Sequence, residues 1–226
     1  GVDAVHKVEI PASWSNPEAD PAPAKLTGRP ETVKMVEDLM NPIALMDGDS
    51  LPVSAFMGNP DGQFEQGASA YEKRGTAVTV PTWDAAKCIQ CNQCAFVCSH
   101  ATIRPFMLSE DEVKAAPANI KLADTKPKAS EYKYTMSVSP LDCMGCGECI
   151  TVCPVGAIEM VPQESQAEEQ PVFDYLVANV GKKPGMPADN TVKGSQFNQP
   201  LLEFSGSCAG CAETSYARLI TQLFGE

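Results

Sequence analysis

The sequence of 226 residues contains no stretch of eighteen consecutive apolar residues, which excludes a membrane-spanning helix. Basic residues are scarce: 17 Lys and Arg stand against 29 Asp and Glu, giving a formal net charge of −12. A chain this acidic repels a phosphate backbone, so no nucleic acid partner is expected. The first residues also lack an apolar signal region, which argues against a secreted protein held by disulfides.

Cysteine is the residue that this sequence has in excess. Eight of the ten cysteines form two runs with the spacing C-x2-C-x2-C-x3-C, and the second run ends in Cys-Pro. This spacing is typical of chains that hold two [4Fe-4S] clusters, where three cysteines of one run bind one cluster and the fourth binds the other. The runs therefore predict two crossed ligand sets: Cys88, Cys91 and Cys94 with Cys153, and Cys143, Cys146 and Cys149 with Cys98.

Zinc and disulfides are the alternatives for these eight cysteines. Two C-x2-C pairs alone would suit structural zinc as well as iron, but neither alternative needs a third C-x2 step in each run. The first run departs from the usual pattern because Ser99, not proline, follows Cys98. Proline there is not a ligand, so the cluster is still expected to assemble. Clusters held by thiolates, in a chain without a signal region, indicate a reducing cytoplasm.

A further pair, Cys208 and Cys211, lies in the segment GSCAGCAET. The other eight cysteines are already assigned to complete sites, which leaves two interpretations of this pair. It is either an isolated redox pair or half of a third cluster site whose remaining ligands lie outside this sequence. His6 and His100 are expected to be structural, because cysteines fill all eight ligand positions of the two complete sites.

The predicted fold class is α+β, a bacterial-type two-cluster ferredoxin domain flanked by pieces of neighbouring α/β domains. Residues 1–29 are expected to end a preceding domain, with a strand at 6–10 and a proline-rich linker. The ferredoxin-like domain is expected over residues 30–182, with insertions and long irregular connectors. Residues 183–226 are expected to form a connector and the start of a further domain.

Local patterns predict the individual elements within these parts. A helix over 31–40 should end at Asn41-Pro42, strands are expected at 75–80, 133–139 and 157–162, and an inserted loop or helix is expected at 108–132. Residues 163–200 are expected to be a connector, and residues 201–204 resemble a strand. A helix at 213–224 is expected to pack one apolar side into the core, the side formed by Tyr216, Leu219, Ile220 and Leu223.

The two cysteine segments, CIQCNQCAFVCSH and CMGCGECITVCPVGAIEM, closely resemble the ferredoxin domain of the pyruvate:ferredoxin (flavodoxin) oxidoreductases, also called pyruvate synthases. The segments SLPVSAF, YEKRGTAVTVPTW and FSGSCAGCAET are similar to flanking segments of that family, in the same order. Bare cysteine runs occur in many ferredoxin-like proteins, but their combination with these segments is far more specific. The resemblance covers most of the chain and is weakest across residues 163–200.

The resemblance implies a segment of an enzyme that converts pyruvate and coenzyme A to acetyl-CoA and CO2 and passes electrons singly to ferredoxin or flavodoxin. It also implies three [4Fe-4S] clusters, thiamine diphosphate with Mg2+, and a homodimer. Cys208 and Cys211 would then be two ligands of the cluster nearest the thiamine, and Glu213 would contact the thiamine cofactor. An acid in the first turn of a helix is an alternative explanation of Glu213. No catalytic residue is expected within this segment.

Two other functions stay open. The chain could be a non-catalytic, polyferredoxin-like electron carrier, or part of an oxidoreductase for another 2-oxoacid. A plain carrier has no use for half of a third site, so the segment from Cys208 to Glu213 favours the enzyme. The residues that would contact the oxoacid lie outside this sequence, and the pattern does not choose between substrates.

Overall fold

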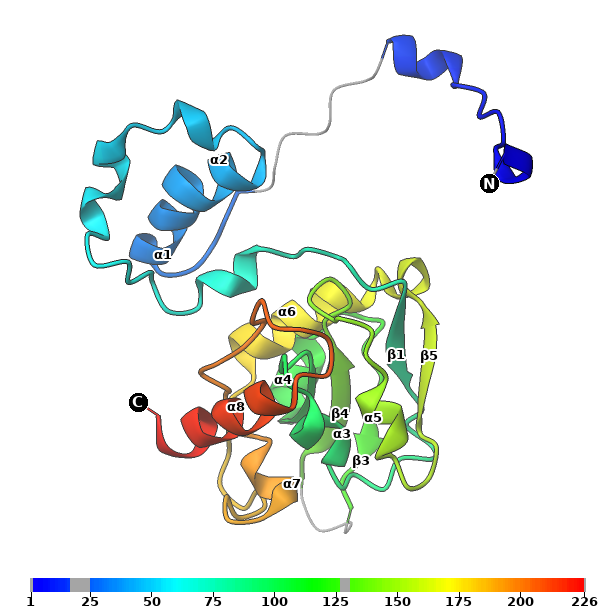
Figure 1. Ribbon diagram of the computed structural model, residues 1–226. Coiled ribbons are helices and arrows are strands. Elements are labelled where there is room, and N and C mark those ends of the chain that lie inside the picture. Colours follow the sequence, from blue (N-terminus) through cyan, green and yellow to red (C-terminus); the bar gives the residue numbers. More distant parts are fainter. Residues whose placement is uncertain (1, 17–24, 127–130, 226) are drawn as a thin grey trace.

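The computed structural model describes residues 2–16, 25–126 and 131–225. Pro17, Pro21 and Pro23 of the predicted linker lie outside these residues. The described chain combines short helices with two antiparallel sheets, an α+β arrangement as predicted (Figure 1). None of its helices is both long enough and apolar enough to cross a bilayer.

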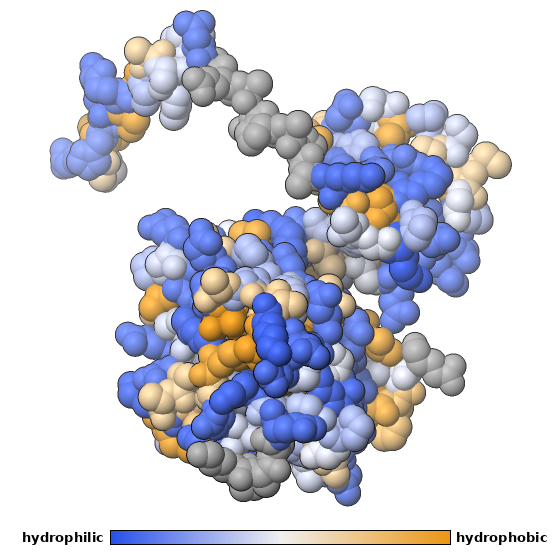
Figure 2. Space-filling model, turned by 180° about the vertical axis from the view of Figure 1, so that it is seen from behind, coloured by the Kyte–Doolittle hydropathy of each residue, from blue (hydrophilic) through white to orange (hydrophobic). Residues whose placement is uncertain are grey.

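The first described segment stands apart from the rest of the molecule (Figures 1 and 2). It contains two 3-10 turns, η1 (Val2–Ala4) and η2 (Ala12–Ser15), and all of its residues are exposed. The predicted strand at 6–10 is wrong, because no described strand pairs with these residues. Alternating apolar residues form a strand only where another strand supplies hydrogen-bond partners.

A small helical lobe follows, over residues 25–71. It comprises α1 (Pro30–Met35), the π-helical turn η3 (Val36–Met40), α2 (Asn41–Ala44), and the 3-10 turns η4 (Gly48–Ser50), η5 (Val53–Gly58) and η6 (Ala68–Tyr71). Its core consists of Met35, Val36, Leu39 and Ala68. The predicted stop at Asn41-Pro42 is wrong: the helix continues to Ala44, because the wider π-helical turn before Pro42 accommodates a residue without an N–H group.

Two antiparallel sheets form the frame of the central domain. β1 (Thr79–Trp83) pairs with β5 (Ile158–Pro162), in the register Trp83 opposite Ile158. In the second sheet, β4 (Lys133–Val138) lies between β2 (Ile103–Leu108) and β3 (Ala123–Asp124). The strands expected at 133–139 and 157–162 are thereby confirmed. The first predicted strand, 75–80, lies four residues too early, since regular pairing with β5 begins only at Thr79.

The two sheets enclose a core in which aromatic rings meet edge to face. Tyr134, which is fully buried, contacts Trp83 at 5.8 Å and Phe197 at 6.4 Å between ring centroids. Cys94 and Cys149 belong to the same buried cluster. The cysteine runs therefore lie against this core, with Cys94 on the short helix α3 (Gln93–Val97) and Cys149 on α5 (Glu148–Thr151).

The inserted and connecting segments contain more helix than their sequences suggest. Residues 108–132 include α4 (Glu110–Ala115), whose first turn is closed by a reciprocal capping box between Ser109 and Glu112. The predicted connector 163–200 contains η7 (Gln163–Gln166), the eleven-residue helix α6 (Glu169–Asn179) and α7 (Val192–Ser195). Pro171 is compatible with α6 because the first N–H groups of a helix have no partner inside it.

The C-terminal helix α8 (Ala212–Phe224) confirms the expected helix, but of its expected core-facing residues Leu219 and Leu223 are only half-buried and the other two are exposed. Tyr216 and Ile220 are each 56% exposed, whereas the buried side consists of Thr214, Arg218 and Gln222. A polar stripe therefore faces the body of the molecule. The strand-like segment 201–204 is irregular instead, because Phe204 adopts a positive φ of 47° and donates its N–H to the His100 carbonyl.

Candidate metal centres

The first cysteine run bends around a cavity at the end of β1. Cys88, Cys91 and Cys94 line this cavity, and Cys153 from the second run lines it as well. Its remaining wall is largely apolar and includes Met136, Val155 and Ile158. Four thiols from two distant parts of the sequence thus face one space, in the combination that the crossed pattern predicts.

The second run bends in a similar way, and Cys98 lies among its thiols. The Thr102 hydroxyl is 3.4 Å from Cys98 Sγ and also forms a hydrogen bond with the Cys143 thiol. The thiol of Cys98 is close enough to Cys143 and Cys149 to raise the pKa of both. Cys98 therefore belongs spatially with the second run, whereas Cys153 belongs with the first.

Backbone amides point at four of these sulfur atoms, at distances of 3.2–3.4 Å. The donors are the N–H groups of Gln90 to Cys88, Thr102 to Cys98, Gly145 to Cys143, and Ala157 to Cys153. Such bonds stabilise the anionic thiolate more than the thiol. They occur at two sulfurs of each set, which suits thiolates that must carry charge in a buried site.

Burial dominates the acid–base behaviour of the innermost thiols. It raises the pKa of Cys143 to about 11 and, together with the neighbouring thiols, that of Cys149 to about 12. Burial also raises the pKa of Cys94 far above its ordinary value, with further repulsion from Cys149 and Cys88. Thiols of this kind ionise at neutral pH only when a cation takes the place of the proton.

A group larger than a single ion fits these donors. Among the described residues, no three His, Cys, Asp or Glu side chains converge closely enough to share one metal ion. The thiols instead surround spaces walled by apolar side chains. A four-iron cubane has one thiolate at each of four separated corners, so it matches both the number and the spread of the donors.

A buried polar network holds the first loop from behind. Asn92, 1% exposed and with a positive φ of 61°, accepts a hydrogen bond from the Tyr134 hydroxyl at 2.7 Å and donates to the Lys193 carbonyl. Gln90 donates to the Asp124 carbonyl at 2.7 Å. These residues were not predicted from the sequence, although Gln90 and Asn92 stand out as polar residues between the first three ligands.

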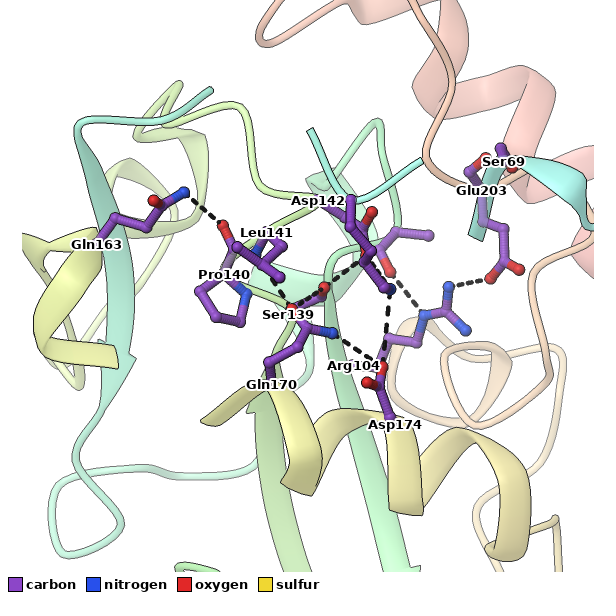
Figure 3. Close-up of polar contacts among 12 residues, drawn as sticks. Ser69, Arg104, Ser139, Pro140, Leu141, Asp142, Gln163, Gln170, Asp174 and Glu203 are labelled. Carbon is purple, nitrogen blue, oxygen red and sulfur yellow. Dashed lines mark hydrogen bonds and ion pairs between the residues drawn. The ribbon is translucent and has the colours of Figure 1, made fainter. Parts of the chain in front are cut away.

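A second polar network holds the entrance to the second loop (Figure 3). Ser139 donates to Asp142 at 2.6 Å and to Gln170 of α6 at 3.0 Å, and Lys73 forms an ion pair with Asp142. Gln163 donates to the Pro140 carbonyl. These contacts link the turn before Cys143 to α6, a helix within the segment that was predicted to be a connector.

The pair Cys208 and Cys211 lies in a more open setting. Cys208 is exposed, and Cys211 immediately precedes α8. The pKa of Cys211 is lowered, first by a hydrogen bond with the Thr214 side chain and then by the Thr214 amide. Between the two cysteines, Gly210 has a φ of +70°, and a Cβ there would be 3.5 Å from Cys146 Cβ. The pair is therefore next to the second set of thiols.

His100 holds the Cys208–Cys211 pair next to the second set of thiols. It is 2% exposed, and its two ring nitrogens lie 3.1 Å from the carbonyl oxygens of Ser205 and Cys208. This is the structural role predicted for His100, whereas His6 is exposed in the first segment. Glu213 is also exposed, in the first turn of α8, and no described side chain holds it in place.

Two family models match the chain. A 4Fe-4S dicluster domain matches residues 87–157, and a domain of unknown function called EKR matches residues 19–77. The pyruvate-flavodoxin oxidoreductase of Klebsiella pneumoniae is 48% identical over 228 residues, which cover 100% of this chain and 19% of that protein. The pyruvate:ferredoxin oxidoreductase of Moorella thermoacetica is 46% identical over 230 residues, with the same two coverages.

A third relative is named for a different electron acceptor. The mitochondrial pyruvate dehydrogenase (NADP+) of Euglena gracilis is 40% identical over 224 residues, 99% of this chain and 12% of that protein. The chain thus spans about a fifth or less of the length of these relatives. Their names share pyruvate and differ in the electron acceptor.

Proposed function

The chain is homologous over its whole length to a segment of pyruvate:ferredoxin and pyruvate-flavodoxin oxidoreductases, and on that premise we propose that it is the electron-transfer segment of such an enzyme. The complete enzyme would oxidise pyruvate with coenzyme A, use thiamine diphosphate and Mg2+, and act as a homodimer in the cytoplasm. Ferredoxin or flavodoxin would be its electron acceptor. The single observation that carries the proposal is the gathering of thiols from both runs around each of two sites.

The crossed ligand sets are part of this proposal. Cys88, Cys91, Cys94 and Cys153 would hold one [4Fe-4S] cluster, and Cys143, Cys146, Cys149 and Cys98 would hold the other. The shared cavity supports the first set, and the contact of Thr102 with both Cys98 and Cys143 supports the second. Bound clusters supply one-electron oxidation and reduction.

The protein's own residues supply the conditions for that chemistry. Buried apolar side chains such as Met136 and Ile158 keep water from the thiols, which lowers the local dielectric. The four amide-to-sulfur bonds offset the negative charge that thiolates bring. The networks around Asn92 and Asp142 hold the two loops in place, so their geometry need not rearrange when the charge of the site changes.

The positions of the three sites support a direction of electron transfer. The Cys208–Cys211 loop, proposed as half of a third cluster site with Glu213 toward thiamine, is next to Cys146 of the second set. We place the first set at the other end of this row, because Gly210 of the loop packs on Cys146 of the second set. There, Lys126 Nζ binds the Cys88 carbonyl and Lys193 Nζ binds the Lys126 carbonyl, so cations surround this end of an acidic chain. We assign this end to the acceptor protein.

The experiment compares two alanine variants of the full-length protein, purified without oxygen. Cys98→Ala should remove the cluster of the second run, and Cys153→Ala should remove that of the first, each detected by iron content and by electron paramagnetic resonance of the remaining cluster. Wild-type protein should contain thiamine and reduce a ferredoxin when pyruvate and coenzyme A are added. Loss of the first-run cluster in Cys98→Ala and of the second-run cluster in Cys153→Ala would refute the crossed sets. Absence of pyruvate-dependent reduction would refute the enzyme.

A further inference from the structure

Arg218 is the largest of the side chains that are almost completely buried in the described part of the chain, with 1% of its surface exposed. Its guanidinium donates to Gln222 at 2.7 Å and to Gln196 at 3.3 Å. It also donates to the backbone carbonyls of Phe96 at 2.7 Å and Ala95 at 3.2 Å. The remaining Nε–H group has no partner among the described residues. A permanent cation is thus held deep inside the molecule.

None of the groups that bind Arg218 carries a negative charge. Its acceptors are two amide oxygens and two backbone carbonyls, and no carboxylate of the described chain forms an ion pair with it. Arg104, a cation close enough to disfavour a charge at Arg218, is itself paired with Glu203. A buried charge without a counter-ion is strongly unfavourable, so a compensating anion should be close.

The position of Arg218 shows where that anion would be. Ala95 and Phe96 lie between Cys94 and Cys98, and the neighbouring Ser215 hydroxyl donates to the Val97 carbonyl. α8 therefore packs on the short segment that ends at Cys98. The Cys98 thiol in turn raises the pKa of Arg218, against the effect of burial. A cluster with four thiolate ligands carries net negative charge, and reduction adds one more unit.

We propose that Arg218 is the internal counter-ion of the cluster held by Cys98, Cys143, Cys146 and Cys149, and that it raises the reduction potential of this cluster. The proposal rests on the ligand sets of the proposed function. Because Arg218 belongs to the helix that begins at Cys211, it also makes the potential of the second site depend on the docking of α8. The competing explanation is purely structural: Arg218 would only cap the carbonyl end of α3.

The test is a redox titration of the full-length protein, followed by electron paramagnetic resonance and accompanied by iron content. Arg218→Gln should make the second-run cluster about tenfold harder to reduce at a fixed applied potential, which is a lowering of 59 mV for one electron. Arg218→Lys keeps the charge but loses most of the hydrogen bonds. At the same applied potential, the ratio of reduced to oxidised second-run cluster should stay within about twofold of wild type.

A second variant leaves Arg218 in place and cancels its charge. Gln196→Glu puts a carboxylate beside the guanidinium and should lower the potential in the same direction as Arg218→Gln. The matched control is the double variant Arg104→Gln/Glu203→Gln. It removes a buried pair with no net charge, so the potential should stay unchanged.

Two outcomes overturn the inference. In variants with full iron content, an unchanged potential in both Arg218→Gln and Gln196→Glu would leave Arg218 as a structural cap only. An equal shift in Arg218→Lys would show that geometry, not charge, sets the potential. If Cys98→Ala and Cys153→Ala did not each lose the cluster of the other run, the proposed ligand sets would be refuted instead. Iron content distinguishes that failure from the failure of this inference.

Discussion

The two cysteine runs and the Cys208–Cys211 pair use the same C-x2-C step in opposite surroundings. Within the runs, Cys94, Cys143 and Cys149 are buried, although Cys146 is exposed, and backbone amides point at four of the sulfurs, Cys143 among them. In the pair, Cys208 is exposed, and the pKa of Cys211 is lowered where those of the buried thiols are raised. The difference teaches that a complete site is recognised by the enclosure of most of its thiols, because spacing alone is common to both.

The largest expected effect is the loss of a whole site. Cys149→Ser should reduce the iron of this segment, prepared with its clusters assembled, from about eight atoms to about four. Cys211→Ser should leave about eight, because the pair contributes to neither enclosed site. Iron assay and visible absorption measure both. If Cys211→Ser removed as much iron as Cys149→Ser, the comparison between enclosed and open thiols would fail.

Alkylation should separate the same two thiols in the iron-free chain. The thiolate is the reactive form, and at pH 7.5 the raised pKa of Cys149, about 12, leaves far less thiolate than the lowered pKa of Cys211. Iodoacetamide should therefore modify Cys211 roughly a thousandfold faster. Raising the pH should increase the alkylation rate of Cys149 until the pH reaches its pKa, whereas the rate at Cys211 should stop rising at a lower pH. Peptide mass spectrometry follows both sites, and equal rates would contradict the difference in burial.

The ion pair between Arg104 and Glu203 should be worth more to stability than any surface pair. Arg104 is buried and Glu203 nearly so, with side chains 7% and 11% exposed, and they join β2 to the segment that carries the open pair. Arg104→Met leaves a buried carboxylate alone and should lower the free energy of unfolding by about 3–5 kcal/mol. Urea titration measures the loss. The exposed pair Lys114–Glu110 is the control: Lys114→Met should change stability by less than about 1 kcal/mol.

Two glycines of the second loop offer a finer comparison. Gly145 and Gly147 both have a positive φ, of 67° and 79°, but a Cβ at Gly145 would meet the Thr79 carbonyl at 3.0 Å, whereas at Gly147 it would meet open space. Gly147→Ala should cost about 1 kcal/mol from backbone strain alone. Gly145→Ala should cost about 1 kcal/mol more, because the loop packs on β1 there. Equal costs by urea titration would show that close approach to β1 does not matter.

The parts of the fold that sequence predicted are those set by short-range chemistry. The cysteine spacing gave the two loops, alternating apolar residues gave β4, and the position directly after the second cysteine run gave β5. α6 was missed because four prolines nearby suggested a connector, although Pro171 falls in the first turn, where it does no harm. The buried side of α8 was predicted wrongly because Arg218 and Gln222 pack inward. Their partners come from α3 and from residues near 196, a tertiary arrangement that local periodicity does not contain.

The shared cavity of Cys88, Cys91, Cys94 and Cys153 also has a consequence for how the protein is made. Some sixty residues separate the first three thiols from the fourth. At a synthesis rate of roughly 5–20 residues per second, the first three leave the ribosome several seconds before Cys153. β1 likewise waits for β5, its only partner in the described chain. During that interval the nascent chain exposes three oxygen-sensitive thiols, so iron insertion is a step that must follow translation of the second run.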